Sequence, residues 1–195
     1  MSLKQYRAMD LISFALILIV SQLVISFAAS RWFADQLYIV SPVAAVTAIV
    51  MMRWGSFAGI HAVVGGAALC LFLGGSCKHL LIYCIGNLLS LAALHMLKKL
   101  GKQSVQTVTG QALGFAALIQ ALMWLGRAVL ALVLYGFDWQ AAVGFVTTDS
   151  LSMVFTLVLI WIARRVDGLF EDQLYYLRRV QKEDTEEQTK GGERT

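Results

Sequence analysis

Long apolar stretches, separated by short polar or charged segments, run through most of the chain. A helix needs about 20 predominantly apolar residues to cross the hydrocarbon core of a bilayer, and six stretches approach that length. We expect spanning helices over Leu11–Ala29, Leu37–Met52, Gly55–Leu73, Leu80–Leu97, Val108–Tyr135 and Ala141–Ala163. The second is the shortest and carries Ser41 and Pro42 near its start. The pattern therefore predicts an all-α, integral membrane six-helix bundle formed by residues 1–163.

The composition leaves little material for a soluble domain. Of the 195 residues, 58% are apolar and only 14% are charged, and the mean hydropathy is +0.70. A soluble domain of this length covers its surface with charged side chains. The first apolar run reaches Ala29, about twice the length of a signal peptide's apolar core, so we expect it to be retained as a helix. The chain is thus predicted to be a multi-pass protein of the bacterial inner (plasma) membrane, in contact with membrane lipid.

Lysine and arginine are distributed unevenly between the two sides of this bundle. One side has only Arg31 and Lys78. The other side collects Lys4, Arg7, Arg53, Lys98, Lys99, Lys102, Arg164 and Arg165. Because short cytoplasmic loops carry the excess of basic residues, we expect both termini in the cytoplasm. The net charge of +4 reflects these loop residues, and no nucleic-acid partner is expected.

The pattern changes after the sixth apolar stretch. Apolar residues recur at helical spacing between 164 and 181, with arginines among them, which predicts an amphipathic extension of the sixth helix. Such a helix lies on the inner membrane surface or against a partner protein, and a solvated helical tail is the alternative. Residues 182–195 are charged and lack apolar side chains, so this tail is expected to be disordered.

Small residues form a stripe along the third predicted helix. Gly55, Gly59, Ala62 and Gly66 fall on one helical face. Such a stripe lets a second helix approach closely, so that van der Waals contact holds the pair together. It serves either packing within the chain or the docking of a second subunit.

Four polar residues are expected at one depth in the membrane. Gln22, Asn87, Arg127 and Asp149 each lie about seven or eight residues from the outer end of a predicted helix. At 1.5 Å of rise per residue, this places all four about 10–12 Å below the outer surface. Intramembrane polar groups face the bundle interior or a water-filled cavity. The cluster is therefore either an outward-facing binding pocket or a structural ion pair of Arg127 with Asp149.

The pocket interpretation assigns a role to each side chain. Trp124 lies three residues before Arg127 on the same helical face, so a planar ligand could stack on Trp124 while Arg127 binds its anionic group. Asn87 and Asp149 would add hydrogen bonds. Tyr83 belongs to the aromatic residues expected around the same zone.

The loop after the third predicted helix reads GGSCKH and ends at His79. Two glycines make it a candidate hinged loop that closes over a pocket. Cys77 and His79 supply only two metal ligands, whereas a structural zinc site takes four. No metal ion and no cofactor are therefore predicted, and Cys77 and His79 are expected to contact the ligand.

A longer segment carries a resemblance to a known family. The stretch from Tyr38 to Gly74, YIVSPVAAVTAIVMMRWGSFAGIHAVVGGAALCLFLG, resembles the substrate-binding S components of energy-coupling factor (ECF) vitamin transporters. The shared features are a second helix ending in a basic turn, here MMRWG, and a glycine-rich third helix. The resemblance implies capture of a vitamin-like substrate from outside, with a transmembrane T subunit and two ATPases driving its uptake.

Two features of the family are missing from the chain. The alanine-x-x-x-alanine docking stripe is not evident near Ser13 and Ala15 in the first helix, so the resemblance implies docking of the T subunit through the third-helix stripe instead. The N-terminal histidine motif of the nickel and cobalt branch is also missing, which argues against free metal ions as substrates.

Three other classes of protein compete with this prediction. An integral-membrane enzyme needs a convergent nucleophile and base, but Asp149 is the one deep carboxylate, and neither HExxH nor a Walker lysine motif occurs. We therefore expect no enzymatic activity. An autonomous carrier or channel should show an inverted repeat or a polar path across both leaflets, and neither is evident. A scaffolding membrane protein without a ligand remains the main alternative.

Overall fold

The computed structural model describes residues 3–32, 38–136 and 138–180, and helices joined by short turns and loops make up this part of the chain. The elements are α1 (Leu3–Trp32), α2 (Val43–Trp54), η1 (Gly55–Phe57), α3 (Ala58–Phe72), α4 (Cys77–Asn87), η2 (Leu88–Ala93), α5 (Leu94–Leu100), α6 (Lys102–Thr107), α7 (Thr109–Leu134), α8 (Trp139–Thr147) and α9 (Ser150–Ala163). No strand occurs among the described residues. The predicted all-α fold is confirmed.

Five helical segments of the described chain are long and apolar enough to cross a membrane. They are Leu3–Trp32, Val43–Phe72, Cys77–Leu100, Thr109–Leu134 and Trp139–Ala163. These five segments are consistent with the predicted multi-pass membrane protein. The expected count of six differs because the second and third predicted helices join into one helical segment without a loop between them.

That joined segment nevertheless reverses direction at Gly55. The backbone of Gly55 has φ +65°, a conformation that glycine adopts without strain. A Cβ atom on Gly65 in α3 would lie 2.7 Å from the Val43 side chain in α2, although a straight helix would hold these residues about 33 Å apart. Val43–Phe72 is therefore a helical hairpin. Its first arm has 12 residues, about 18 Å of helix.

The chain before α2 is not helical from residue 38 to residue 42. The second helix was predicted to start at Leu37, which lies outside the described residues, but it starts at Val43. Pro42 explains the difference, since a proline disfavours helical backbone in the residue before it. We call residues 38–42 the strap. Its Ile39 N–H donates to the Thr148 carbonyl at 2.6 Å, which ties the strap to the junction between α8 and α9.

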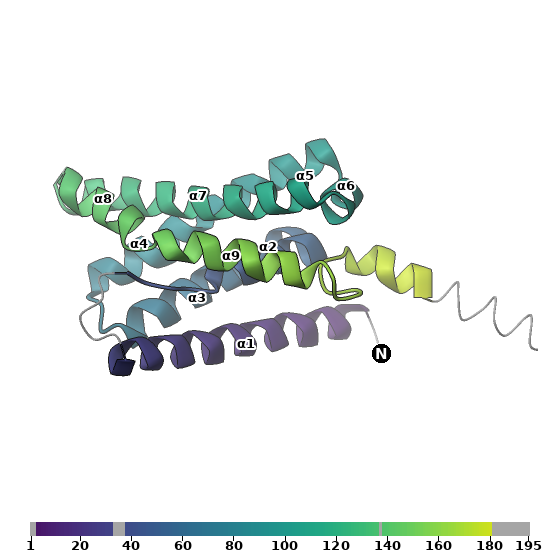
Figure 1. Ribbon diagram of the computed structural model, residues 1–195, viewed down its shortest axis with the longest axis horizontal. Coiled ribbons are helices and arrows are strands. Elements are labelled where there is room, and N and C mark those ends of the chain that lie inside the picture. Colours follow the sequence, from purple (N-terminus) through teal and green to yellow (C-terminus); the bar gives the residue numbers. More distant parts are fainter. Residues whose placement is uncertain (1–2, 33–37, 137, 181–195) are drawn as a thin grey trace, which may run out of the picture.

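Figure 1 shows α1 along one edge of the bundle and α7 along the opposite edge, with α2, α3, α4 and α9 between them. Helix α1 packs chiefly on α3, whereas α7 packs on α4, α8 and α9. One apolar core joins α1, α2, α3, α7 and α9. A second and smaller core joins the end of α3 to α4, α7 and α8, and it borders the candidate site.

The basic residues gather at one end of the bundle, together with both ends of the described chain. Arg53, in the α2–α3 turn, pairs with Asp10 of α1 at 2.7 Å. The Tyr6 hydroxyl donates to Gln173 at 3.0 Å. Figure 1 places the start of α1 and the C-terminal helix at this same end. We call it the basic end, and its cytoplasmic location stays a prediction.

The first part of the C-terminal segment packs against the basic end. Helix α9 ends at Ala163, turns follow, and a separate helix covers 173–180. The predicted continuous extension of the last helix is thus interrupted, because Gly168 takes a left-handed conformation with φ +68°. Phe170 is buried in the main core, and Arg53 donates to the carbonyls of Gly168 and Leu169. Residues 181–195, which include the predicted disordered tail, lie outside the described residues.

The small-residue stripe of α3 is used for packing inside the chain. A Cβ atom on Gly66 would lie 2.7 Å from the Tyr83 carbonyl oxygen of α4, and one on Gly59 would lie 3.1 Å from the Leu91 side chain. Ala62 is fully buried. Gly55 belongs to the turn rather than to the stripe. Of the two roles that the sequence allowed, packing within the chain is the one that these buried contacts serve, and docking of a second subunit stays a prediction.

Candidate functional site

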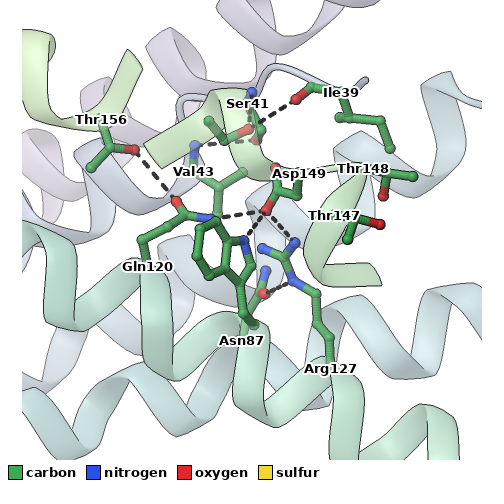
Figure 2. A network of polar contacts seen from close by, with 12 residues as sticks. Ile39, Ser41, Val43, Asn87, Gln120, Arg127, Thr147, Thr148, Asp149 and Thr156 are labelled. Carbon is green, nitrogen blue, oxygen red and sulfur yellow. Dashed lines mark hydrogen bonds and ion pairs between the residues drawn. The ribbon is translucent and has the colours of Figure 1, made fainter. Parts of the chain in front are cut away.

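A buried ion pair joins α7 to the junction between α8 and α9 (Figure 2). Arg127 of α7 donates from Nη1 to Asp149 Oδ2 at 2.6 Å and from Nε to Asn87 Oδ1 at 2.8 Å. All three residues are at most 1% exposed. The prediction that they share one depth is met by direct contact, and these contacts use two of the five N–H donors of the guanidinium group.

The Asp149 carboxylate collects further donors from α7. Its Oδ2 also accepts from Gln120 Nε2 at 2.8 Å and from Trp124 Nε1 at 3.0 Å. Thr156 donates to Gln120 Oε1 at 3.4 Å and connects the cluster to α9. Oδ1 has no hydrogen-bond partner among the described residues. We call Asn87, Gln120, Trp124, Arg127 and Asp149 the buried network.

The backbone brings these side chains together at two places. Asp149 lies at the break between α8 and α9, outside the helical conformation at φ −97° and ψ 10°, so its side chain can face α7. On the other side, α4 and α7 touch through Gly86 and Gly126, where a Cβ on Gly126 would lie 2.0 Å from the Gly86 carbonyl oxygen. This close approach puts Arg127 beside Asn87.

Gln22 belongs to a second buried polar chain rather than to the network around Arg127. Its Oε1 accepts from the Ser41 hydroxyl at 2.9 Å, and its Nε2 donates to Ser26 at 3.2 Å. The Ser41 N–H donates to the Ser152 hydroxyl at 2.9 Å, three residues after Asp149. Hydrogen bonds therefore link α1, the strap and α9 near the depth of the ion pair.

A cavity of about 780 Å³ lies at the end of the bundle opposite the basic end. It is bounded by the strap, the end of α3, the loop 73–76 and parts of α4, α7 and α8. Its lining comprises Ile39, Cys70, Leu73, Gly74, Gly75, Ser76, His79, Tyr83, Tyr135, Asp138, Ala141, Gly144, Phe145 and Thr148. Its volume is typical of pockets that hold small molecules. We call it the loop-end cavity.

Tyr83 connects this cavity to the buried network. Its ring lines the cavity, and the Arg127 guanidinium carbon lies 4.8 Å from the ring centroid. This distance is in the range of a cation–π contact. Arg127 itself is not among the residues that line the cavity. The positive charge therefore supports the tyrosine from behind and does not face the open space.

The predicted ligand-contacting residues divide into two groups. His79 and Tyr83 line the loop-end cavity, whereas Asn87, Arg127 and Asp149 are buried in the network next to it. Two further side chains differ from expectation. Trp124 is half-buried and bonds to Asp149, and Cys77 is exposed and is not part of the cavity lining.

Several residues of the site were not expected from the sequence, and Gln120 and Phe145 illustrate why. Gln120 lies seven residues, about two helical turns, before Arg127, so the spacing could have placed it on the same face. Phe145 lies four residues before Asp149 and lines the cavity. An apolar residue in an apolar helix gives no signal of this kind, because its sequence context is the same as that of a lipid-facing residue.

The surroundings of the loop-end cavity include a second cavity but, among the described residues, no candidate metal site. A second cavity of about 530 Å³ lies between α1, α3 and the strap, and Ile39 and Leu73 line both cavities. Within the described ranges, no cluster of three or more histidine, cysteine or acidic residues could hold a metal ion. Binding chemistry at this end therefore depends on rings, hydroxyls and one carboxylate.

Neither a protein-family model, nor a curated protein sequence, nor a solved structure matches the chain.

Proposed function

We propose that this chain is the substrate-capture subunit of an ECF-type transporter, which binds a vitamin-like small molecule from outside in the loop-end cavity. In this proposal a transmembrane T subunit and two ATPases drive the uptake of the bound molecule. The observation that carries the proposal is the cavity itself. It is the size of a ligand pocket, it lies at the end opposite the basic residues, and a buried polar network supports its wall.

The proposal includes an orientation in the bacterial cell membrane. We place the basic end in the cytoplasm, with both termini there, because short cytoplasmic loops carry the excess of lysine and arginine. The loop-end cavity then faces outside. The hairpin at Gly55 supports separate passages of α2 and α3, which gives six crossings, with the strap completing the passage of the short α2.

The roles proposed here for the side chains at the cavity differ from the roles predicted from the sequence. Tyr83 and His79 would contact the ligand, and the loop 73–76 would lie over it. Arg127 would act as a positioning residue, since its guanidinium group is occupied by Asp149 and Asn87 and reaches the cavity only through the Tyr83 ring. The fully buried pair can hold that ring in one place without contributing a charge to the ligand.

Ligand capture is tested by mass spectrometry of small molecules that copurify with the full chain from its host membrane. The decisive variant is Gly144→Trp. Gly144 lines the cavity, and a Cβ there meets no atom within 4 Å, so an indole would fill the open space without forcing the backbone. Gly114→Trp in α7 is the matched control, because its Cβ is equally unobstructed and it lies outside the cavity.

We expect a small molecule to copurify with the unmodified chain and with the control variant Gly114→Trp. The same molecule should be missing from Gly144→Trp. A ligand that binds only the folded chain also raises its melting temperature, so adding the recovered molecule back should stabilise the first two proteins alone. If all three proteins carry the same molecules and show equal melting temperatures, the capture function is wrong, and a scaffold without a ligand explains the fold better.

A further inference from the structure

Aromatic rings form most of one wall of the loop-end cavity. The His79 ring lies 6.2 Å from Tyr135 and 5.7 Å from Phe145, and Tyr83 meets Phe145 edge-on at 5.6 Å. These centroid distances fall in the range of aromatic contacts. The four rings come from α4, the end of α7 and α8, and they lie beside an open volume. A flat ring could extend this cluster by one more member.

The charges around the cavity limit what such a ring can carry. Among the described residues that line it, Asp138 is the one acidic side chain, and there is no lysine or arginine. Asp138 Oδ1 caps α8 by accepting from the backbone of Gln140 and Ala141. No hydrogen bond to Asp138 Oδ2 is present in the described part of the chain, so this oxygen can accept one from a ligand.

The nearest cations are already engaged. Arg127 is 1% exposed and paired with Asp149. The Lys78 ammonium group lies 5.3 Å from the centroid of the Tyr135 ring, on an exposed side chain outside the cavity lining. An anionic ligand would therefore lose its hydration without gaining a positive partner inside the cavity, which is unfavourable in a site of low polarity. A cation would gain both the ring faces and Asp138.

From this arrangement we infer that the loop-end cavity selects a planar aromatic ligand that carries a positive charge or none, and excludes anionic ones. The ring would lie against His79, Tyr83 and Phe145, and a cationic group would point to Asp138. This inference rests on the proposed function, because it names the substrate class of the same cavity. It also replaces the expectation that Arg127 binds an anionic group.

Three indoles of matched shape test the charge rule: tryptamine is a cation, tryptophol is neutral and indole-3-acetate is an anion. Binding of each to the purified full chain in detergent is measured by calorimetry at millimolar ligand. We expect tryptamine to bind most tightly, tryptophol next and indole-3-acetate least. Cyclohexylethylamine has the charge of tryptamine but an aliphatic ring, and we expect it to bind more weakly than tryptamine.

Asp138→Asn assigns the charge preference to one residue. Asparagine caps a helix as well as aspartate does, so α8 should be preserved. The advantage of tryptamine over tryptophol should fall by up to about fivefold, the size of one exposed ion pair. Lys78→Ala is the control and should not reduce the binding of any of the three indoles.

The inference is overturned if indole-3-acetate or cyclohexylethylamine binds as tightly as tryptamine, or if none of the three indoles binds. These results leave ligand capture itself open to its own test. An anionic molecule that copurifies with the chain and is displaced by Gly144→Trp would refute the charge rule while supporting capture.

Discussion

Breaking the buried ion pair should destabilise the bundle, and the loss should depend on whether Arg127 or Asp149 is replaced. In Arg127→Ala the Asp149 carboxylate keeps two donors, Gln120 and Trp124, but loses its counter-charge. Removing one partner of a buried ion pair usually lowers the free energy of unfolding by about 3–5 kcal/mol. Side-chain exposures of 2% and 1% place this pair among the fully buried ones, so we expect a loss in that range.

Asp149→Ala should cost more, because three donors share the oxygen that it removes. Besides Arg127, the side chains of Gln120 and Trp124 would lose their acceptor. A lost hydrogen bond at a neutral buried donor costs about 1 kcal/mol. Arg127→Ala in turn leaves one neutral acceptor, Asn87 Oδ1, without its donor. The free energy of unfolding should therefore fall by about 1 kcal/mol more in Asp149→Ala than in Arg127→Ala, since two neutral groups lose a partner in the first variant and one in the second.

Denaturant unfolding in detergent micelles measures both values, and the double variant Arg127→Ala with Asp149→Ala completes the thermodynamic cycle. A second double variant separates the loss of charge from the loss of volume. Arg127→Met with Asp149→Leu removes both charges and keeps apolar volume, so it should be more stable than either alanine variant. The reasoning is refuted if the two alanine variants each lose less than about 1 kcal/mol, the size of an exposed pair, or if the effects of the two sites simply add.

Two further changes test packing contacts, one beside the buried network and one at the basic end. Gly126→Ala should prevent α4 and α7 from packing closely, because its Cβ would lie 2.0 Å from the Gly86 carbonyl oxygen. We expect the folded monomer to be lost on size-exclusion chromatography. The control Gly114→Ala, whose Cβ meets no atom within 4 Å, should stay folded. Arg53→Ala should release the C-terminal segment, which Arg53 holds through two backbone carbonyls. Limited proteolysis should then cut the chain after residue 163 faster than it does in the control variant Arg165→Ala. Arg165 stacks on Trp161. Equal cleavage of these two variants would contradict the docking role of Arg53.

The depth of the polar residues could be predicted from the sequence, but their partners could not. Counting residues from the ends of apolar stretches placed Asn87, Arg127 and Asp149 at one level, since helical rise is constant. Whether two such side chains face each other depends on how the helices are rotated. That rotation is set here by the contact of Gly86 with Gly126, between residues 40 positions apart, and no local pattern encodes it.

The differences in the fold have local causes that act against the hydrophobic pattern. Apolar periodicity continues through the strap, through the α8–α9 junction and beyond Ala163, so it predicts helix in all three places. Pro42 ends that tendency in the strap, the left-handed Gly168 ends it after α9, and Asp149 leaves the helix to reach Arg127. These residues were visible in the sequence, but a proline, a glycine or an aspartate also occurs inside helices.

The expectation for Arg127 changes most. A lone arginine within a membrane helix indicates either a ligand contact or an ion pair, and the sequence supported both. The structure pairs it with Asp149 and buries it behind Tyr83. Loss of binding in an Arg127 variant would consequently reflect a displaced Tyr83 ring or an unstable fold, and direct cavity changes such as Gly144→Trp are the clearer test.

The claim on which the account depends is that the loop-end cavity opens to the outside while the basic end lies in the cytoplasm. Cys77 lies at the start of α4 beside this cavity and is exposed, whereas Cys70 is buried and Cys84 is half-buried. A membrane-impermeant maleimide added to intact cells should label the chain at Cys77, and Cys77→Ser should abolish that labelling. Labelling that appears only after the cells are broken open would place the cavity on the inner side and contradict the proposed capture of an external molecule.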